Sequence, residues 1–578
     1  MDRSTQELKF RRRLVVTLFV SAAAVLVWRT VYLQFHESDF LQSHGDARYL
    51  RTDEIHADRG MIVDRNGQPL AISSPTLSAW VRPRVFIAHR EQWTEVARIL
   101  DTTLEHLETL VLPRSGRHFV YLKRHITPEQ GAALAALKID GLELQGEYRR
   151  YYPAAEVASH VVGFTNVDDR GQEGIELAFD AVLSGEPGQR RVIKDRLGRV
   201  IEDVERLREI RPGKTVRLSV DNRVQYVAYR ELKNAVHRHR ARAGSLVLTD
   251  VATGEVIALV NQPSFNPNNR SELKGEHYRN RAVTDLFEPG STIKPFTVAA
   301  ALESGMYQPS SVVETAPGRF KLGKHTVRDI RNFGTLNVSG IIEKSSNVGA
   351  SKLALAMEPE RLWQVLRGVG VGGVSQIALP GETYGRLSEF DHWREIEHAT
   401  LAFGYGMSIT AAQLARAYGA IANDGVLVPL SILKSEGMVY EERAFQASTA
   451  AALRQMLRKV VENGTGKLAQ VPGYSVAGKT GTVHKSTVEG YAEDRYLALF
   501  AGMIPADNPQ LVAVIVIDEP QSGQHFGGQV AAPIFSAVMS EATRILNIAP
   551  DQSATNEPMP VWLAERLGSP DALQDLQQ

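Results

Sequence analysis

The N-terminal part of the chain is an apolar segment long enough to cross a bilayer. Residues 14–28 form an uncharged, mostly apolar run, and residues 31–33 extend it past Arg29. About 20 helical residues at 1.5 Å each reach about 30 Å, the thickness of a bilayer core. Arg29 lies near the end of the run, where its long side chain can reach the interface. The pattern predicts a transmembrane anchor over residues 14–33 after a short tail, residues 1–13.

The charges beside this run predict its orientation. Lys9 and the arginines at 11–13 precede it, whereas acidic residues at 37, 39 and 46 follow it. Basic flanks stay in the cytoplasm, so we expect the N-terminus inside and everything after residue 33 outside. A cleaved signal peptide, with Ala22–Ala24 imitating a cleavage site, is the alternative. Apolar residues continue beyond those alanines, which favours the anchor.

The stretch after the anchor has a different pattern. Residues 40–215 carry short apolar runs among Arg, Asp and Gly, with sustained helical spacing only near residues 93–112. Residues 211–214 (Arg-Pro-Gly-Lys) form a turn cluster that is typical of a boundary. We therefore predict an extended, strand-rich domain over residues 34–214.

The second half of the chain alternates strand-like and helix-like patterns. Two β-rich runs come first, a helix-rich stretch follows, and three strands return near the end. This order predicts one sheet with a helical insertion over residues 215–548, and a flexible C-terminal tail over residues 549–578. The predicted elements are a strand at 215–220, a helix at 222–239, a hairpin of 245–251 with 255–260, a helix at 290–302, and strands at 475–484, 496–502 and 511–517.

The amino-acid composition excludes several kinds of partner and active site. Lys plus Arg (66) equals Asp plus Glu (66), so no basic field favours a nucleic acid partner. The chain has no cysteine, which excludes disulfides, thiol nucleophiles and cysteine-ligated metal sites. Its 16 histidines are scattered without a His-Glu-x-x-His motif, so we expect no metal and no cofactor.

Three short motifs contain residues that could be catalytic, although each motif alone is weak evidence for an active site. Ser-x-x-Lys occurs at 271–274, 291–294 and 431–434, but only the second follows a Pro-Gly turn and opens an apolar helix, whose N-terminus favours developing negative charge. Ser-x-Asn occurs at 264–266 and 345–347, and Lys-Thr-Gly once, at 479–481. Taken singly, such motifs are more often helix caps, turns or surface lysines.

A phosphate-binding loop is the rival interpretation of the third motif. Residues 473–480 satisfy Gly-x4-Gly-Lys-Thr, and residues 511–519 form an apolar strand ending in acids. That site requires a helix directly after the loop, and Gly481-Thr-Val-His484 begins a helix poorly. The expected topology also places this region where nucleotide is scarce.

In their order, however, Ser-x-x-Lys at 291, Ser-x-Asn at 345 and Lys-Thr-Gly at 479 are the motifs of penicillin-recognising serine enzymes. The sequence most closely resembles a class B penicillin-binding protein of the division type, the penicillin-binding protein 3 family. Phe403 stands where many relatives carry tyrosine, and 483–485 (Val-His-Lys) replaces a more basic segment. The other matching segments are 59–67, 150–153, 160–163, 171–176, 288–294, 344–349 and 403–406.

The resemblance implies a multidomain α/β fold. A single transmembrane helix would lead into an elongated strand-rich pedestal of the dimerisation type. A transpeptidase domain would follow, with a central antiparallel sheet flanked by helices and an all-helical subdomain.

The resemblance also implies a role for each motif residue. Ser291 would be the nucleophile and Lys294, neutral through burial and the neighbouring Lys479, its base. Ser345 would relay a proton to the leaving amine, Asn347 would hold Lys294 and the substrate amide, and the Ser291 and Thr482 N–H groups would form the oxyanion hole. The implied substrate-binding residues are Lys479, Thr480, Gly481, Thr482 and Tyr405. They would bind the terminal carboxylate of a D-Ala-D-Ala stem or of a β-lactam.

The implied reaction is septal D,D-transpeptidation at the inner membrane, with the catalytic domain in the periplasm. We find no Glu-x-x-Leu-Asn element after Ser345 to position water, as a β-lactamase requires, and no glycosyltransferase domain. Polymerisation would then fall to a membrane-bound polymerase of lipid-linked disaccharide within the division complex. A non-catalytic penicillin-binding sensor or division scaffold is the alternative, and a P-loop ATPase is a distant third.

Overall fold

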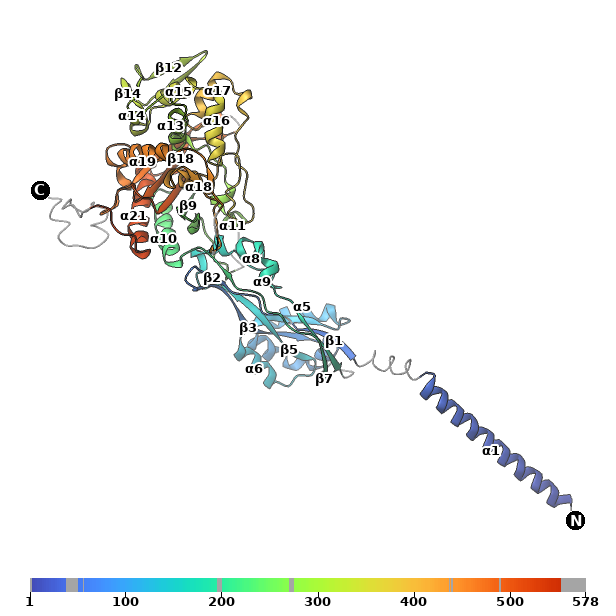
Figure 1. The fold of residues 1–578 in the computed structure, drawn as a ribbon. Helices are drawn as coiled ribbons and strands as arrows, with labels where there is room; N and C mark the ends of the chain where they lie inside the picture. Colours follow the sequence, from blue (N-terminus) through green and yellow to red (C-terminus); the bar gives the residue numbers. More distant parts are fainter. Residues whose placement is uncertain are drawn as a thin grey trace. The chain divides into compact units, whose positions relative to one another are not determined.

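The computed structural model describes residues 3–37, 50–55, 57–194, 200–269, 275–435, 437, 440–487 and 490–552. The chain divides into two compact units, which Figure 1 draws as ribbons. One unit comprises residues 1–58 and 185–213, and the other comprises residues 59–184 and 214–578. Each is described by itself.

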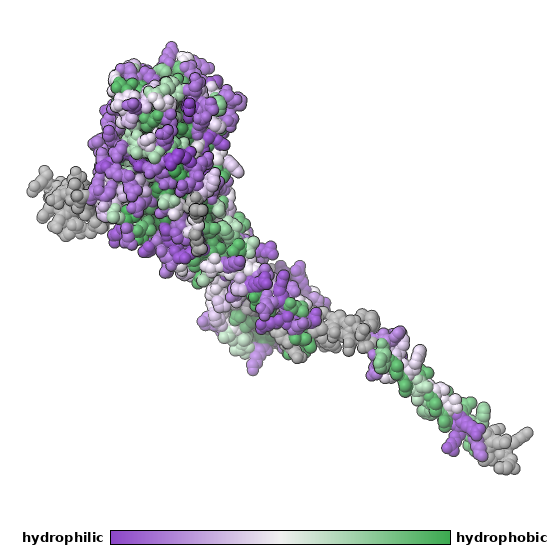
Figure 2. All heavy atoms as spheres, in the orientation of Figure 1, coloured by the Kyte–Doolittle hydropathy of each residue, from purple (hydrophilic) through white to green (hydrophobic). Residues whose placement is uncertain are grey.

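The first unit contains the apolar helix and a small sheet. Helix α1 (Arg3–Phe35) includes a span, Leu8–Phe35, long and apolar enough to cross a membrane. Figure 2 shows apolar residues along most of α1. The helix begins well before residue 14 because the preceding residues are mostly good helix formers. Strands β1 (Leu50–Ile55), β6 (Gly188–Lys194) and β7 (Val200–Arg208) pair antiparallel in the order β1-β6-β7.

The N-terminal part of the second unit is a sheet flanked by short helices. Its strands are β2 (Ile62–Val63), β3 (Pro69–Val81), β4 (Val120–Ile126), β5 (Leu142–Tyr151) and β8 (Val216–Arg217). The order is β4-β3-β2-β8, with β5 also paired to β3. The predicted strand at 215–220 is therefore only two residues long. The helices are α3 (Pro83–Phe86), α4 (Trp93–Ile99), α5 (Leu104–Val111), α6 (Pro128–Ala136), α7 (Ser159–Val162), α8 (Gly174–Ala178) and α9 (Asp180–Leu183).

The helical pattern at 93–112 is confirmed, but these residues form two helices rather than one. Helix α4 ends at Ile99, and α5 begins after Thr103, whose hydroxyl accepts a hydrogen bond from the His106 N–H. Trp93 and Phe86 stack with ring centroids 4.9 Å apart in the buried core. The helical pattern predicted near 93–112 therefore corresponds to two short helices packed in the core of this strand-rich domain.

A buried ionic cluster joins segments far apart in the sequence. Glu176 accepts hydrogen bonds from Arg59 Nε (2.7 Å) and Arg150 Nε (2.6 Å), and all three side chains are at most 1% exposed. Arg59 also contacts Asp180 at 2.7 Å. The surrounding charges outweigh burial, so the pKa of Arg59 is raised. Arg59, Arg150 and Glu176 come from three of the segments that carry the family resemblance, so those segments contribute to the packing of this domain.

We expect Glu176→Ala to unfold this domain. Removing one partner of a buried ion pair leaves an uncompensated charge and costs about 3–5 kcal/mol. A thermal melt followed by circular dichroism will show a lower Tm or loss of soluble protein. Glu95→Ala is the control, because Glu95 pairs with Arg98 on the surface with 44% of its side chain exposed. Equal melting of both variants would contradict the importance of the cluster.

The C-terminal part of the second unit is built on one antiparallel sheet of order β10-β9-β19-β18-β17. Its strands are β9 (Ala243–Asp250), β10 (Val256–Gln262), β17 (Ala477–Thr487), β18 (Gly490–Ile504) and β19 (Leu511–Asp518). The predicted order of two strands, helices and three strands is confirmed. Strand β17 lies at one edge of the sheet.

Helices cover both faces of this sheet. On one face Leu246 and Leu248 pack in the same core as α10 (Asn222–Arg238) and α21 (Ala532–Ile545). Val247 points to the other core with α13 (Lys294–Glu303), α18 (Ala411–Ala422) and α19 (Ala447–Glu462). The two-residue period of the strands explains why both faces are apolar. Figure 1 shows α10 and α21 side by side against the sheet.

The helical insertion between β10 and β17 is not all-helical, which corrects that expectation. It carries three short antiparallel pairs: β11 (Val312–Glu314) with β14 (Thr335–Asn337), β12 (Arg319–Leu322) with β13 (His325–Arg328), and β15 (Val426–Leu427) with β16 (Glu442–Arg443). Gly318, Gly323 and Gly334 have positive φ and permit the chain reversals. The remaining helices are α11 (Gly275–Tyr278), α12 (Arg281–Thr284), α14 (Val338–Lys344), α15 (Asn347–Leu355), α16 (Pro359–Gly368), α17 (Glu395–Leu401) and α20 (Gly527–Val530).

The first residues of the predicted tail contact the domain. Asp551 accepts a hydrogen bond from the Ser475 N–H at 2.7 Å, and the Gln552 N–H donates to the Gly473 carbonyl at 3.2 Å. The rest of the predicted tail, 553–578, lies outside the described residues.

Candidate active site

Ser291 lies in a tight turn that other backbone segments hold in place. A 3-10 turn (Gly290–Ile293) leads into α13, so Ser291 precedes the α-helix that was expected to begin at 290. Gly290 has φ +54° and donates to the Gly404 carbonyl at 3.1 Å. A Cβ on Gly404 would lie 2.2 Å from the Gly290 oxygen, so only glycine permits this approach. The Phe-Gly-Tyr-Gly segment thus supports the turn that presents Ser291.

Lys294 is buried at the start of α13 and points to Ser345. Its Nζ lies 2.6 Å from the Ser345 carbonyl oxygen and 3.1 Å from Ser345 Oγ. Ser345 ends helix α14 in the left-handed conformation (φ 60°, ψ 41°), just before α15 begins at Asn347. Lys294 has no exposed surface. The first two motifs therefore meet at one hydroxyl.

Lys479 reaches the same hydroxyl from the sheet edge. It lies on β17 with no exposed surface, and its Nζ donates to Ser345 Oγ at 3.0 Å. A Cβ on Gly290 would lie 2.4 Å from Val483 Cγ2, so the Ser291 turn packs directly on β17. The three separated motif segments therefore lie together in the structure, with both lysines at the Ser345 hydroxyl.

Burial makes both lysines readier to lose a proton, and the charge of Lys479 adds to this effect at Lys294. Desolvation, followed by the charge of Lys479, lowers the pKa of Lys294 well below its usual value. Desolvation lowers the pKa of Lys479 to about 7. Since general bases must be deprotonated, these pKa shifts suit Lys294 to take a proton from a hydroxyl.

The lowered lysine pKa values predict a pH dependence. We expect the rate constant for acylation by a β-lactam to rise with pH as Lys294 loses its proton and to level off well below 10.5. The free energy of unfolding should also rise with pH. Between the lowered pKa of each lysine in the folded chain and its ordinary pKa in the unfolded chain, the unfolded chain binds more protons, so raising the pH favours the folded chain. Stopped-flow acylation from pH 5 to 10 checks this. A rate that still climbs at pH 10 would contradict it.

Asn347 is part of a turn held by an acid that the sequence analysis missed. Asp329 accepts hydrogen bonds from the Asn347 N–H (2.5 Å), the Val348 N–H (3.0 Å) and the Ser346 hydroxyl (2.6 Å). The Asn347 amide donates to the Arg328 carbonyl at 3.1 Å. Within the described residues Asn347 makes no hydrogen bond to Lys294. The side chain of Lys294 instead donates to the carbonyl and the hydroxyl of Ser345. No motif pointed to Asp329.

The Lys-Thr-Gly segment lies within β17, the edge strand of the sheet. The hydroxyls of Thr480 and Thr465 share a hydrogen bond of 2.7 Å, and Thr482 Oγ1 accepts from the Gly527 N–H at 3.0 Å. A Cβ on Gly481 would lie 3.0 Å from Thr292 Cγ2. Glycine at 481 therefore lets the strand pack against the Ser291 turn. This packing role is additional to the substrate-binding role that the family resemblance implies for Gly481.

Tyr405 lies beside a cleft next to the Ser291 turn. Its ring contacts Phe403 and Tyr491 at centroid distances of 5.7 and 5.4 Å. Glu288 accepts hydrogen bonds from the Gly406 N–H (2.8 Å) and the Tyr491 hydroxyl (3.1 Å), and burial raises its pKa. A cavity of about 420 Å³ is lined by residues that include Glu288, Gly406, Val483 and His484. Glu288 stood in the matched segment 288–294 but received no role from the sequence.

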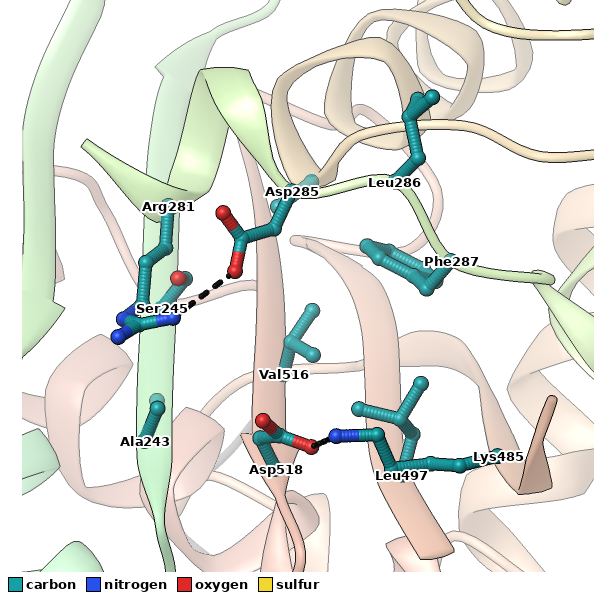
Figure 3. Close-up of a pocket in the computed structure, with 12 residues that line it drawn as sticks. Ala243, Ser245, Arg281, Asp285, Leu286, Phe287, Lys485, Leu497, Val516 and Asp518 are labelled. Carbon is teal, nitrogen blue, oxygen red and sulfur yellow. Dashed lines mark hydrogen bonds and ion pairs between the residues drawn. The ribbon is translucent and has the colours of Figure 1, made fainter. Parts of the chain in front are cut away.

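A second cavity, of about 90 Å³, contains none of the motif residues in its lining (Figure 3). Arg281 pairs with Asp285 at 3.0 Å on one side of it, and Lys485 pairs with Asp518 at 2.7 Å on the other. Lys485 also contacts Glu519 at 2.6 Å. Lys485 is thus engaged in ion pairs across the sheet.

The geometry excludes the phosphate-loop alternative. Thr480 lies within strand β17, which continues to Thr487. No helix follows Lys479 and Thr480, so the helix N-terminus that would cradle phosphate is absent from this described segment.

Comparisons with known proteins agree with this arrangement. The family profile described as "Penicillin binding protein transpeptidase domain" matches residues 244–540, and "Penicillin-binding Protein dimerisation domain" matches residues 54–218. The chain belongs to the penicillin-binding protein transpeptidase family. The first profile covers the sheet and all three motifs, and the second covers the buried ionic cluster.

Relatives within this family align along nearly the whole chain. Peptidoglycan D,D-transpeptidase FtsI of Escherichia coli K12 is 41% identical over 556 residues, 95% of this chain and 94% of its own. Probable peptidoglycan D,D-transpeptidase PbpC of Pseudomonas aeruginosa is 41% identical over 549 residues, 95% of this chain and 97% of its own.

Solved structures show the same fold. Penicillin binding protein 3 of Mycobacterium tuberculosis, complexed with aztreonam, has a TM-score of 0.68 and 30% identity, covering 87% of this chain and 100% of its own. The transpeptidase domain of Burkholderia pseudomallei penicillin-binding protein 3 has a TM-score of 0.54 and 44% identity, covering 58% and 98%. Like these proteins, the chain is a multidomain α/β penicillin-binding protein, and α1 is its one described helix fit for a membrane anchor.

Proposed function

We propose that this chain cross-links the stem peptides of septal peptidoglycan through a serine acyl-enzyme and that β-lactams inhibit it covalently. One observation carries the proposal: Lys294 Nζ and Lys479 Nζ both lie within 3.1 Å of Ser345 Oγ, beside the turn that presents Ser291. The family and its named D,D-transpeptidase relatives support the same chemistry.

The first half-reaction is acylation of Ser291. Neutral Lys294 takes the hydroxyl proton while Ser291 Oγ bonds to the carbonyl carbon of the penultimate D-alanine. The peptide bond to the terminal D-alanine breaks, and Ser345, hydrogen-bonded to both lysines, passes the proton to the departing amine. The Ser291 and Thr482 N–H groups stabilise the oxyanion, and losing one such donor typically costs about 10²–10³ in rate.

The carboxylate and amide contacts position the donor stem. Lys479, Thr480 and Thr482 bind the terminal carboxylate along the edge strand, where Gly481 keeps β17 close to the Ser291 turn. Asn347 holds the substrate amide from the turn that Asp329 fixes. Tyr405 precedes Gly406, which lines the adjoining cleft. In the second half-reaction the amine of another stem attacks the ester and releases Ser291.

A non-catalytic sensor or division scaffold is the other candidate. A reconstituted reaction distinguishes the two: the full chain in detergent, a lipid-linked disaccharide pentapeptide and a separate glycan polymerase. We expect cross-linked dimeric muropeptides and free D-alanine, both blocked by benzylpenicillin. Benzylpenicillin labelling without any cross-link or D-alanine release would favour the scaffold.

The proposal includes a location and a partner. Lys9 and the arginines at 11–13 precede the apolar span, and basic flanks stay in the cytoplasm. The N-terminus therefore lies in the cytoplasm and the catalytic domain in the periplasm. The partner is a membrane-bound polymerase of lipid-linked disaccharide, together with other proteins of the division complex.

The absence of cysteine permits a clean test of orientation. We expect a membrane-impermeant maleimide to label Glu358→Cys, at an exposed helix cap, in spheroplasts with an intact inner membrane. Lys9→Cys should be labelled only after permeabilisation. The reverse pattern would overturn the orientation, and the unsubstituted chain controls for background.

A further inference from the structure

The β12–β13 hairpin concentrates positive charge in a chain of zero net charge. Residues 319–331 contain five cationic side chains and one acid, Asp329. All five cations are exposed. They are Arg319, Lys321, Lys324, Arg328 and Arg331. We refer to these five residues as the cationic hairpin.

The register of the hairpin separates an apolar face from a charged face. Phe320 lies opposite Val327, whose side chain is buried, and Lys352 lies over the Phe320 ring at 5.5 Å. Arg319 lies directly opposite Arg328. One face is therefore fixed against the domain, and the other presents cations to solvent.

Local stability does not explain this arrangement of charge. Like charges directly opposite on paired strands are destabilising. None of the five cations forms an ion pair with any residue in the described part of the chain. The nearby acids are engaged: Asp329 holds the Ser-x-Asn turn, and Glu314 accepts hydrogen bonds from the Ala316 N–H and the Thr335 hydroxyl. The charged face thus has no counter-charge paired with it among the residues that the structure describes.

The base of the hairpin is part of the active-site framework. Arg328 supplies the carbonyl that accepts from the Asn347 amide, and the next residue, Asp329, binds the backbone of 347 and 348. Ser345, two residues before Asn347, carries the hydroxyl that both motif lysines contact. A ligand on the charged face therefore lies next to the segment that would hold a bound stem.

We propose that the cationic hairpin binds carboxylates of uncross-linked stem peptides on a glycan strand and so guides the strand to the active site. The inference rests on the proposed function, in which the substrate is a polymer carrying many such carboxylates. Charge complementarity favours stem peptides as the ligand. The hairpin cations form no ion pair among the described residues, and each uncross-linked stem ends in a carboxylate. Attraction between exposed charges steers association and weakens as salt is added.

Co-sedimentation of the full chain in detergent with purified, uncross-linked glycan strands tests the proposal. The hairpin variant is Arg319→Gln/Lys321→Gln/Lys324→Gln, which leaves Arg328 and Asp329 in place. The matched control is Arg361→Gln/Lys467→Gln/Arg544→Gln, which removes three exposed cations that form no ion pair among the described residues. At low salt we expect the hairpin variant to bind strands about tenfold more weakly and the control like the wild type. The difference should vanish at 1 M salt.

Further probes identify the ligand chemistry. Strands whose carboxyls have been amidated should bind the wild type and the hairpin variant equally. Vesicles of phosphatidylglycerol and phosphatidylethanolamine should not distinguish the hairpin variant from the control. Equal strand binding by both variants, a loss that persists on amidated strands, or a loss confined to vesicles would overturn the proposal.

The readouts separate this inference from the proposed function. Sedimentation measures binding without turnover, so it decides the role of the hairpin even if the wild type fails to cross-link. Acylation by benzylpenicillin reports whether the Ser291 site of each variant is intact. A hairpin variant that acylates normally yet binds strands weakly supports a separate docking surface.

Discussion

Ser291→Ala will abolish covalent labelling of this chain by fluorescent penicillin and its release of D-alanine. In the proposed reaction the ester forms on the Ser291 hydroxyl, and the Gly290–Gly404 contact and the packing of Gly290 on Val483 hold the turn that contains Ser291 against β17. Losing the nucleophile of a serine enzyme typically costs about 10⁶ in kcat. Gel fluorescence after incubation with the probe, together with muropeptide analysis, measures both effects.

The chain supplies a matched control for this change. Ser431 also begins a Ser-x-x-Lys motif, but its hydroxyl donates to the Leu433 carbonyl, and Lys434 pairs with Glu255 at 2.8 Å. Ser431→Ala should label like the wild type. Labelling of the Ser291→Ala variant at the wild-type rate would remove Ser291 as nucleophile. A variant that loses labelling but keeps full cross-linking would show that the two activities use different groups.

Lys294→Ala is expected to slow acylation by about 10²–10⁴, the usual contribution of a general base. The amine is buried, and its pKa is lowered by desolvation and by Lys479, so it is suited to accept the Ser291 proton. The Lys294→Arg variant should be nearly as slow, because a guanidinium stays charged and cannot act as a base. Stopped-flow kinetics with a chromogenic cephalosporin measures the rate constant.

A thermal melt accompanies this experiment, because an alanine at a buried position can destabilise the fold. Removing the buried amine also removes the cost of burying a polar group, so we expect the Tm of Lys294→Ala to stay near that of the wild type. Near-normal acylation by either folded variant would contradict the assignment of Lys294 as base. Slow acylation by the alanine variant alone, with an active arginine variant, would indicate a purely electrostatic role.

The sequence predicted the strands of the sheet from local signals, and the motif residues were recognised through resemblance to a known family. The strands at 245–260 and 475–517 are apolar runs bounded by turns, and every one lies in the observed sheet. Ser291, Ser345 and Lys479 were recognised by order and spacing, and the structure brings their segments together. Motif chemistry and strand periodicity are both local properties.

What the sequence did not predict depends on tertiary contacts. Asp329 fixes the Ser-x-Asn turn from 18 residues away, and the Gly404–Gly290 contact joins positions more than 100 residues apart. The short strands within the helical insertion follow from positive-φ glycines that also occur in ordinary turns. The packing of Gly481 against Thr292 was not predicted, because a glycine shows that space is needed without showing for which neighbour.

Peptide mapping by mass spectrometry of the benzylpenicillin adduct identifies the nucleophile, since it locates the acylated residue without any assumption about geometry. We expect one adduct per chain, on the peptide that contains Ser291, with none on the peptides that contain Ser345 or Ser431. An adduct on any other residue, or none after complete reaction, would contradict the claim that the three motifs serve one nucleophile.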